Sequence, residues 1–128
     1  MAKAAADEAA RLIRDAIAAR GRARIVVATG SSQIEFLESL VTAPDIDWSK
    51  VELFHLDEYI GLAGGHPASF QHYIRERILA RTPAGRAWLL DGMADPEEEC
   101  KRAGAAISAA PIDVAFAGIG ENGHLAFN

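Results

Sequence analysis

The sequence is poor in cysteine, with Cys100 as the single thiol among 128 residues. One thiol excludes an intramolecular disulfide and any metal site built from several thiolates. It fits a reducing compartment, so we expect a cytoplasmic protein. The histidines at positions 55, 66 and 72 have no i, i+4 spacing with one another, and a metal site is therefore not expected.

Long apolar runs and clusters of basic residues are also missing. No stretch approaches the ~18 consecutive apolar residues that a membrane-spanning helix needs, and charged residues interrupt the N-terminal segment where a signal peptide would be apolar. The 13 Lys and Arg are scattered, and 18 Asp and Glu give a net charge of −5. We therefore expect neither a membrane nor a nucleic acid as a partner.

Apolar residues are plentiful, and their spacing predicts helices that alternate with strands. They make up 50% of the chain, enough for a buried core, and the length suits one domain, 1–128. A helix at 4–19 and a buried β-branched strand at 25–27 come first. Further helices are expected at 33–41, 69–81 and 95–110, and further strands at 51–56, 87–92 and 112–118. This order predicts an α/β fold, a three-layer, doubly wound, mostly parallel sheet of Rossmann-like type.

Polar residues gather directly after three of the predicted strands, at 29–32, 57–58 and 118–124. Ligands of open parallel sheets bind outside the carboxyl ends of the strands. The topology alone therefore predicts that these three clusters lie close together.

The first cluster, TGSS, suits a phosphate group. A glycine between a strand and a helix leaves backbone amides pointing outward, and Ser31 and Ser32 add hydroxyl donors. The alternative is a simple turn in which Ser31 or Ser32 only caps the following helix. The segment is neither a Walker loop nor a dinucleotide fingerprint.

In the second cluster, Asp57 and Glu58 point to opposite faces, so we expect only one of them to face the crevice. A carboxylate there could remove a carbon-bound proton next to a carbonyl. The alternative is a pair of solvated loop acids. The third cluster places His124, which titrates near neutral pH, in a glycine loop.

The segments FHLDEYIGLAGGHPASFQHYIRERI and GIGENGHLAFN together resemble the glucosamine-6-phosphate deaminase (isomerase) family, and the likeness runs from ATGSSQ to the last residue. The 6-phosphogluconolactonases share the fold and a GxGxxGH loop. Their strand-end motif is usually DER where this chain has DEY, and TAS follows their histidine where this chain has LAF. The deaminase branch fits better.

The resemblance implies that glucosamine 6-phosphate and water become fructose 6-phosphate and ammonia, without a cofactor or a metal. It implies that Asp57 takes the proton from C2 and that His124, next to Asn122, assists ring opening. The expected substrate-binding residues are Thr29, Gly30, Ser31, Ser32, Glu58, Gly118 and Gly120. A lactonase-like sugar-phosphate hydrolase and a non-catalytic sugar-phosphate-binding protein remain alternatives.

Two departures from the family pattern bear on these roles. Asn122 stands where family members often carry Asp, and an amide can hydrogen-bond the imidazole of His124 but stabilises its charged form less than a carboxylate does. The phosphate loop reads TGSSQ where TGGTP is commoner, although the donors remain. We therefore expect slower or differently tuned turnover, or a different amino sugar phosphate.

The family also runs to roughly twice this length, and its pattern continues after AFN with a catalytic acid and with phosphate-binding cations. The resemblance therefore implies the N-terminal portion of a longer domain, with an incomplete sheet. From it we expect little turnover by 128 residues alone. Family members commonly form homo-oligomers, and the assembly of this chain stays open.

Overall fold

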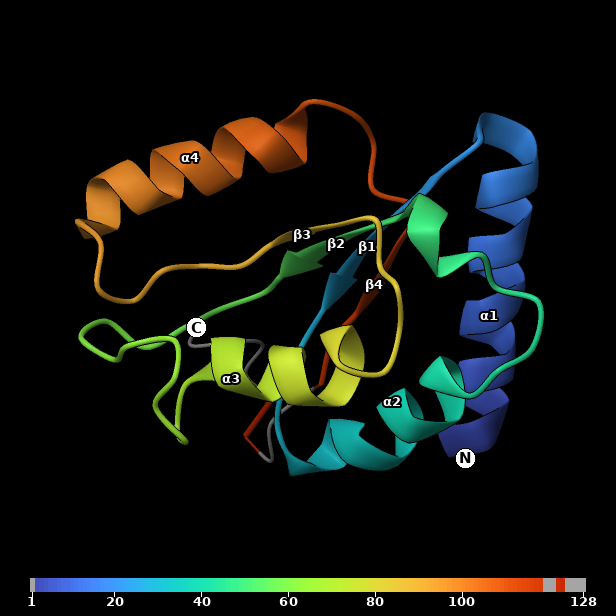
Figure 1. Ribbon diagram of the computed structural model, residues 1–128, viewed down its shortest axis with the longest axis horizontal. Helices are drawn as coiled ribbons and strands as arrows, with labels where there is room; N and C mark the ends of the chain where they lie inside the picture. The colour runs from blue at the N-terminus through green and yellow to red at the C-terminus, as the bar shows by residue number, and fades with distance from the viewer. Residues whose placement is uncertain (1, 119–121, 124–128) are drawn as a thin grey trace.

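The computed structural model describes residues 2–118 and 122–123, in which four parallel strands form one sheet (Figure 1). The strand order is β3-β2-β1-β4. The strands are β1 (Ala23–Val27), β2 (Val51–His55), β3 (Arg86–Trp88) and β4 (Val114–Phe116). The helices are α1 (Ala2–Arg20), α2 (Ile34–Val41), α3 (Phe70–Ile74) and α4 (Pro96–Ser108). Helices and strands alternate as the periodicity predicts, and the expected α/β fold with a parallel sheet is confirmed.

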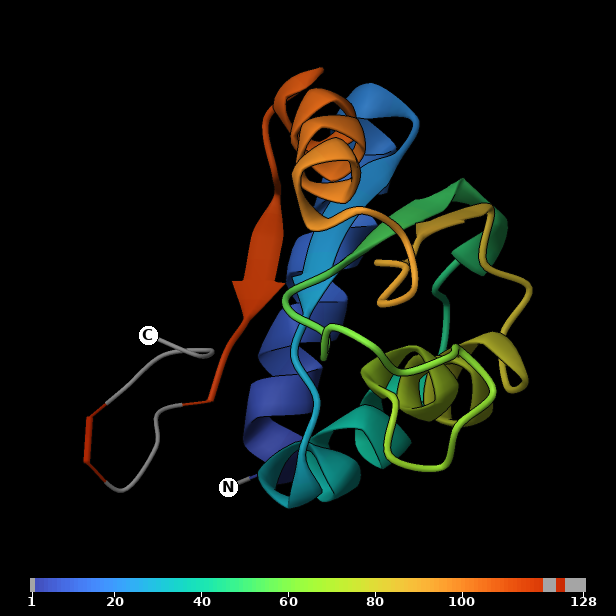
Figure 2. The ribbon, with the colours of Figure 1, turned by 90° about the vertical axis from the view of Figure 1, so that its left-hand side faces the viewer.

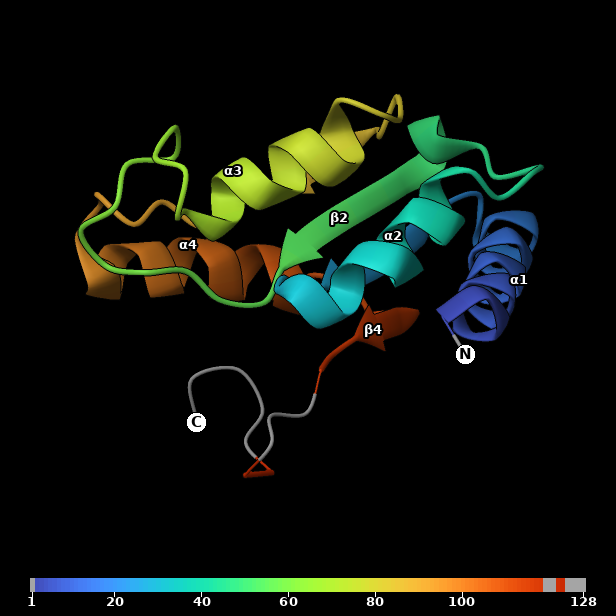
Figure 3. The ribbon, with the colours of Figure 1, turned by 90° about the horizontal axis from the view of Figure 1, so that it is seen from below.

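The main core lies on one face of the sheet, beneath α1, α2 and α3 (Figure 3). Strand β1 is buried at all five positions because it lies between two neighbours. Its residues Ile25 and Val27 face the same cluster as Leu53 of β2, and all three are fully buried. Helix α1 contributes Ile13 and a stripe of alanines. Each large aliphatic side chain buried here stabilises the fold by about 1.5–3 kcal/mol.

Helix α4 covers the other face of the sheet (Figure 2). The side chain of Arg24 in β1 contacts the last turn of this helix. The helix begins as the sequence predicts, since Asp95 accepts a hydrogen bond from the amide of Glu98 at 3.1 Å and Pro96 opens the first turn. At the far end the guanidinium of Arg24 donates to carbonyls of the last turn, including that of Ala106 at 2.6 Å. A positive charge at that position complements the helix dipole.

Three local expectations are corrected. The helix expected at 69–81 is α3 followed by a π-helical turn, Arg75–Leu79, in which the amide of Ala80 donates to the Arg75 carbonyl at 2.8 Å. The strand expected at 87–92 ends at Trp88. The alternative in which Ser31 or Ser32 caps the following helix is wrong, because Gly30 is the N-cap of a 3-10 turn, Ser31–Gln33, Gln33 is the N-cap of α2, and no side chain caps either one.

Within the part of the chain that the structure describes, no helix is long and apolar enough to cross a bilayer.

Candidate active site at the carboxyl ends of the strands

The direction of the chain through the sheet reverses at β1, which lies between β2 and β4. The chain leaves β1 toward β2 on one side and returns to β4 on the other, and ligands of such sheets bind at this reversal. Val27 lies opposite His55 of β2 and opposite Phe116 of β4. The three strands therefore end level with one another, and the three polar clusters leave the same edge of the sheet.

The loop after β1 presents backbone donors. Gly30 has φ 110° and ψ 165°, a backbone conformation open essentially to glycine alone. Its carbonyl accepts hydrogen bonds from the amide of Gln33 at 3.1 Å and from the hydroxyl of Tyr73 at 2.8 Å. Ser31 and Ser32 are exposed, and the first amides of a helical turn have no acceptor within that turn. An anion could bind these amides and hydroxyls together.

The glycine loop after β4 begins beside this loop. A Cβ atom added to Gly118 would lie 3.3 Å from Nε2 of Gln33 and 3.5 Å from Oγ of Ser32. The structure thus brings Gly118, the first residue of the third cluster, next to the first cluster although the two are far apart in the sequence. Asn122 is exposed, whereas Gly120 and His124, both expected in the site, lie outside the described residues.

The loop after β2 brings Asp57 to the same edge. The amide of Leu56 donates to the Val27 carbonyl at 3.1 Å, which ties the exit of β2 to the end of β1. Asp57 follows directly and is half-buried. Burial, with a smaller contribution from the charge of Glu58, raises the pKa of the Asp57 carboxyl. A carboxylate with a raised pKa is better matched to proton transfer near neutral pH.

Glu58 is held by the start of α3. Its carboxylate accepts hydrogen bonds from the Ser69 hydroxyl at 2.7 Å and from the amides of Phe70 at 2.9 Å, Gln71 at 2.8 Å and Tyr59 at 2.9 Å. Burial raises the pKa of Glu58, but these hydrogen bonds outweigh it and the net pKa is lowered. Glu58 therefore anchors a helix, and its expected contact with substrate stays a prediction.

His55, the last residue of β2, is buried directly before the loop that carries Asp57 and Glu58. The sequence assigned it no role. It is 6% exposed, and its Nδ1 accepts a 3.4 Å hydrogen bond from the amide of Leu90. Its Nε2 has no hydrogen-bond partner among residues 2–118 and 122–123. Burial lowers the pKa of His55 to about 4, although the charge of Glu58 opposes the shift. The one available signal was its place directly before the LDE motif.

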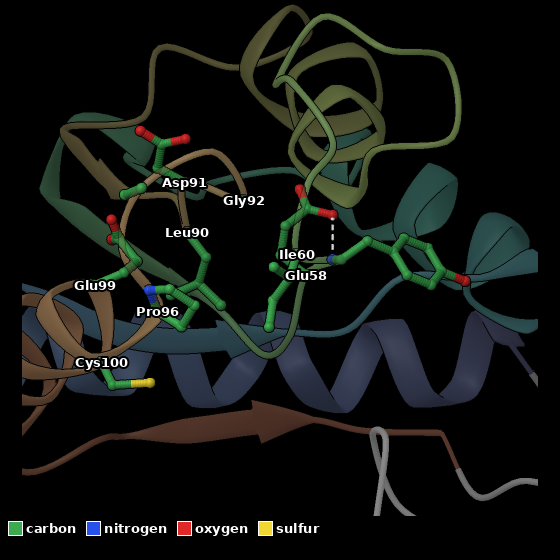
Figure 4. Close-up of a pocket in the computed structure, with 10 residues that line it drawn as sticks. Glu58, Ile60, Leu90, Asp91, Gly92, Pro96, Glu99 and Cys100 are labelled. Atoms are coloured by element: carbon green, nitrogen blue, oxygen red, sulfur yellow. Dashed lines mark hydrogen bonds between the residues drawn. The ribbon is translucent and has the colours of Figure 1, made fainter.

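A hollow of about 210 Å³ opens on the far side of Glu58, between this loop and the start of α4 (Figure 4). Ile60, Leu90 and Cys100 line it. The two loops meet where the amide of Gly61 donates to the Gly92 carbonyl at 2.7 Å. A Cβ on Gly92 would lie 2.2 Å from the Tyr59 carbonyl oxygen, so the close approach requires glycine. Of the expected site residues that the structure describes, only Glu58 lines this hollow.

No group of three or more His, Cys, Asp or Glu side chains within residues 2–118 and 122–123 is arranged to hold a metal ion. The described edge offers backbone and hydroxyl donors after β1 and two half-buried carboxylates, Asp57 and Glu58, after β2.

Comparison with known sequences supports a common ancestry with sugar-phosphate enzymes. Residues 1–127 match the family described as glucosamine-6-phosphate isomerases/6-phosphogluconolactonase. The chain is 38% identical over 103 residues to a glucosamine-6-phosphate deaminase of Latilactobacillus sakei, covering 80% of this chain and 43% of that protein. It is 37% identical over 118 residues to the deaminase of Streptococcus pyogenes serotype M1, covering 91% and 50%.

Solved structures give the same answer for the fold. A monomeric glucosamine-6-phosphate deaminase matches with a TM-score of 0.84 and 27% identity, over 98% of this chain and 55% of that one. A 6-phosphogluconolactonase from Shewanella baltica matches with a TM-score of 0.83 and 28% identity, over 98% and 56%. The chain spans about half the length of the relatives it matches.

Proposed function

Because the chain belongs to the glucosamine-6-phosphate isomerase/6-phosphogluconolactonase family, we propose that the protein is a deaminase that converts glucosamine 6-phosphate and water to fructose 6-phosphate and ammonia. The curated relatives named as deaminases favour this branch. The observation that supports the proposal is that Gly118 lies beside Ser32, and that Leu56, directly before Asp57, is hydrogen-bonded to Val27 at the end of β1.

In the proposed reaction, the amides and hydroxyls of residues 29–32 hold the phosphate, and His124, oriented by Asn122, assists opening of the sugar ring. Asp57 then removes the proton from C2, which is acidic because the open form carries a carbonyl at C1. The proton is returned at C1 and leaves an imine at C2. Water adds to the imine and ammonia departs, which gives the ketose. The reaction needs no cofactor.

The test follows ammonia release from glucosamine 6-phosphate, using the protein expressed from its complete reading frame. Asp57→Asn is expected to slow release by about 10²–10⁴-fold, because the general base is lost, while binding of the sugar phosphate remains measurable. In D2O the fructose 6-phosphate formed by the wild type should carry deuterium at C1 whenever the abstracted proton exchanges with solvent.

The matched control is Asp91→Asn, which removes another carboxylate from a loop that follows a strand. Asp91 is exposed, and its Oδ1 accepts a hydrogen bond from the amide of Met93. Full activity is expected. A wild-type rate in Asp57→Asn would remove Asp57 from the mechanism.

A lactonase-like hydrolase is the second candidate, favoured by the fold match to the Shewanella protein. Offering 6-phosphogluconolactone separates the two, since hydrolysis of the lactone without ammonia release from the amino sugar would select the lactonase. Tight binding of the amino sugar phosphate with no product over hours would select a non-catalytic binding protein.

We also propose that the protein works in the cytoplasm, takes a sugar phosphate as a small-molecule partner and binds neither nucleic acid nor membrane. A homo-oligomer is part of the same proposal, and light scattering at several concentrations tests it. Support comes from the single thiol, the scattered basic residues and the family relationship.

A further inference from the structure

Tyr73 of α3 reaches across to the loop that follows β1. Its ring packs against the main core, and its hydroxyl donates a 2.8 Å hydrogen bond to the Gly30 carbonyl, 43 residues away in the sequence. Burial raises the pKa of the Tyr73 hydroxyl, and the positive charge of Arg77 offsets this only in part. The hydroxyl therefore stays protonated, and remains a donor, throughout the neutral range.

The bond from Tyr73 fixes the direction of a neighbouring amide. The Gly30 carbonyl and the Ser31 amide belong to one planar trans peptide, so they point in opposite directions. The carbonyl is held by two donors, the Tyr73 hydroxyl and the Gln33 amide at 3.1 Å. With the carbonyl turned toward α3, the Ser31 amide faces away from α3. Glycine at position 30 permits the φ of 110° that this arrangement needs.

Helix α3 is itself fixed by the residue that follows Asp57. The carboxylate of Glu58 accepts hydrogen bonds from the Ser69 hydroxyl and the Phe70 and Gln71 amides at the start of the helix. Tyr73 lies about one turn further along α3. Direct contacts thus lead from the Asp57 loop, through α3, to the Gly30 carbonyl, and both parts of the candidate site take their positions from one helix.

We propose that Tyr73 is a positioning residue for the substrate phosphate: by holding the Gly30 carbonyl it aims the Ser31 amide at the anion and sets the distance from the anion to Asp57. The inference rests on the proposed function, since it assigns the 29–32 loop to a phosphate. Tyr73 itself contacts no substrate. Nothing in the local sequence pattern marks it, because its ring reads as an ordinary core residue of an amphipathic helix.

The test compares Tyr73→Phe with the wild type, each expressed from the complete reading frame, in binding titrations with inorganic phosphate and with glucosamine 6-phosphate. Loss of one orienting hydrogen bond is expected to weaken both ligands about fivefold to tenfold. The KM for glucosamine 6-phosphate should rise by a similar factor. The acid limb of the pH–rate profile, which reports Asp57, should stay in place.

Arg81→Gln is the matched control. Arg81 donates to Glu38 of α2 at 2.7 and 3.1 Å, so this variant also removes a tether between the 70–81 segment and the 30–41 segment, but at the end remote from the loop. Unchanged phosphate binding is expected. Thermal unfolding of all three proteins is recorded, and binding is measured well below each midpoint.

Three results separate the possibilities. The positioning role would be overturned if Tyr73→Phe bound both ligands as tightly as the wild type. It would also be overturned if ligand binding were weakened equally in Tyr73→Phe and Arg81→Gln, because that result would indicate a general loosening of the structure. Wild-type protein that binds neither ligand would instead overturn the proposed function, on which the inference depends.

Discussion

The two ends of the sheet differ in whether their charged and titratable groups are paired. At the amino end, Arg24 is 3% exposed and fully engaged, with Glu52 at 2.6 Å, carbonyls of α4 and the ring of Phe54 at 4.7 Å. At the carboxyl end, Asp57 is half-buried and accepts no hydrogen bond from the described residues, and His55 is buried and neutral.

The difference leads us to predict which end stabilises the fold and which end is available for chemistry. Paired groups contribute stability because each charge finds a partner. Burial disfavours the charged form of a group and shifts its pKa accordingly. Groups with pKa values shifted in this way concentrate at functional sites. We therefore expect substitutions at the amino end to change the free energy of unfolding at neutral pH, and substitutions at the carboxyl end to change turnover or the pH dependence of stability.

The largest effect on stability is expected from Arg24→Met. The change leaves Glu52 without its partner and the last carbonyls of α4 without donors, so the free energy of unfolding should fall by about 3–5 kcal/mol in urea titrations. Arg11→Met, which breaks exposed ion pairs on α1, is the control and should change little. Equal losses in the two variants would contradict the assignment of stability to the amino end.

The next largest effect is expected on the pH dependence of the free energy of unfolding, and it comes from His55. The unfolded chain takes up the proton near pH 6.5 and the folded chain only near pH 4. The contribution of His55 to the free energy of unfolding is therefore fully present above pH 6.5 and is lost as the pH falls from 6.5 toward 4. At about 1.4 kcal/mol per pH unit, the free energy of unfolding should fall by about 2 kcal/mol between pH 6.5 and 5.

His55→Asn removes the titrating group and keeps an acceptor for the Leu90 amide. Urea titrations of the wild type and of His55→Asn are carried out at about pH 7.5 and about pH 5. The difference between the two proteins isolates the effect of His55, because the stabilisation from carboxylates such as Glu58 falls with pH in both proteins alike. Parallel pH dependences would show that His55 is not held neutral in the folded chain.

The smallest effect on stability is expected from Asp57→Asn, the variant with the largest effect on turnover. Because the pKa of Asp57 is raised on folding, the ionised carboxylate opposes folding at neutral pH, and that cost diminishes as the pH falls and the group is protonated. Removing the charge should leave the midpoint of thermal unfolding unchanged or raise it. A clear drop would place Asp57 among the stabilising groups and erase the contrast between the two ends.

Local patterns were sufficient to predict most of the fold. The β-branched run at Ile25–Val27 predicted a buried strand, and Asp95 followed by Pro96 predicted the start of α4. The π-helical turn at Arg75–Leu79 was missed because its residues read as an ordinary amphipathic helix. A hydrophobic periodicity of 3.6 residues does not distinguish a π-helical turn from an α-helical one.

The site was predictable only in part, for a related reason. Strand-end position marked Asp57 and the 29–32 loop, since topology alone gathers such residues. The contacts that organise them join distant segments: Glu58 to Ser69, Tyr73 to Gly30, and Gln33 to Gly118. None of these pairs leaves a local signal. Glu58 anchors the start of α3, and its expected contact with substrate stays a prediction.

The central place of β1 has a consequence for the order of folding. One side of β1 can pair with β2 early, but its other partner, β4, follows Asp113, which lies 89 residues after Arg24. During synthesis the side of β1 that pairs with β4 therefore stays unpaired until α2, α3 and α4 have been made. We therefore expect the loops that follow β1 and β4 to come together later than any other pair of neighbouring loops in the described chain.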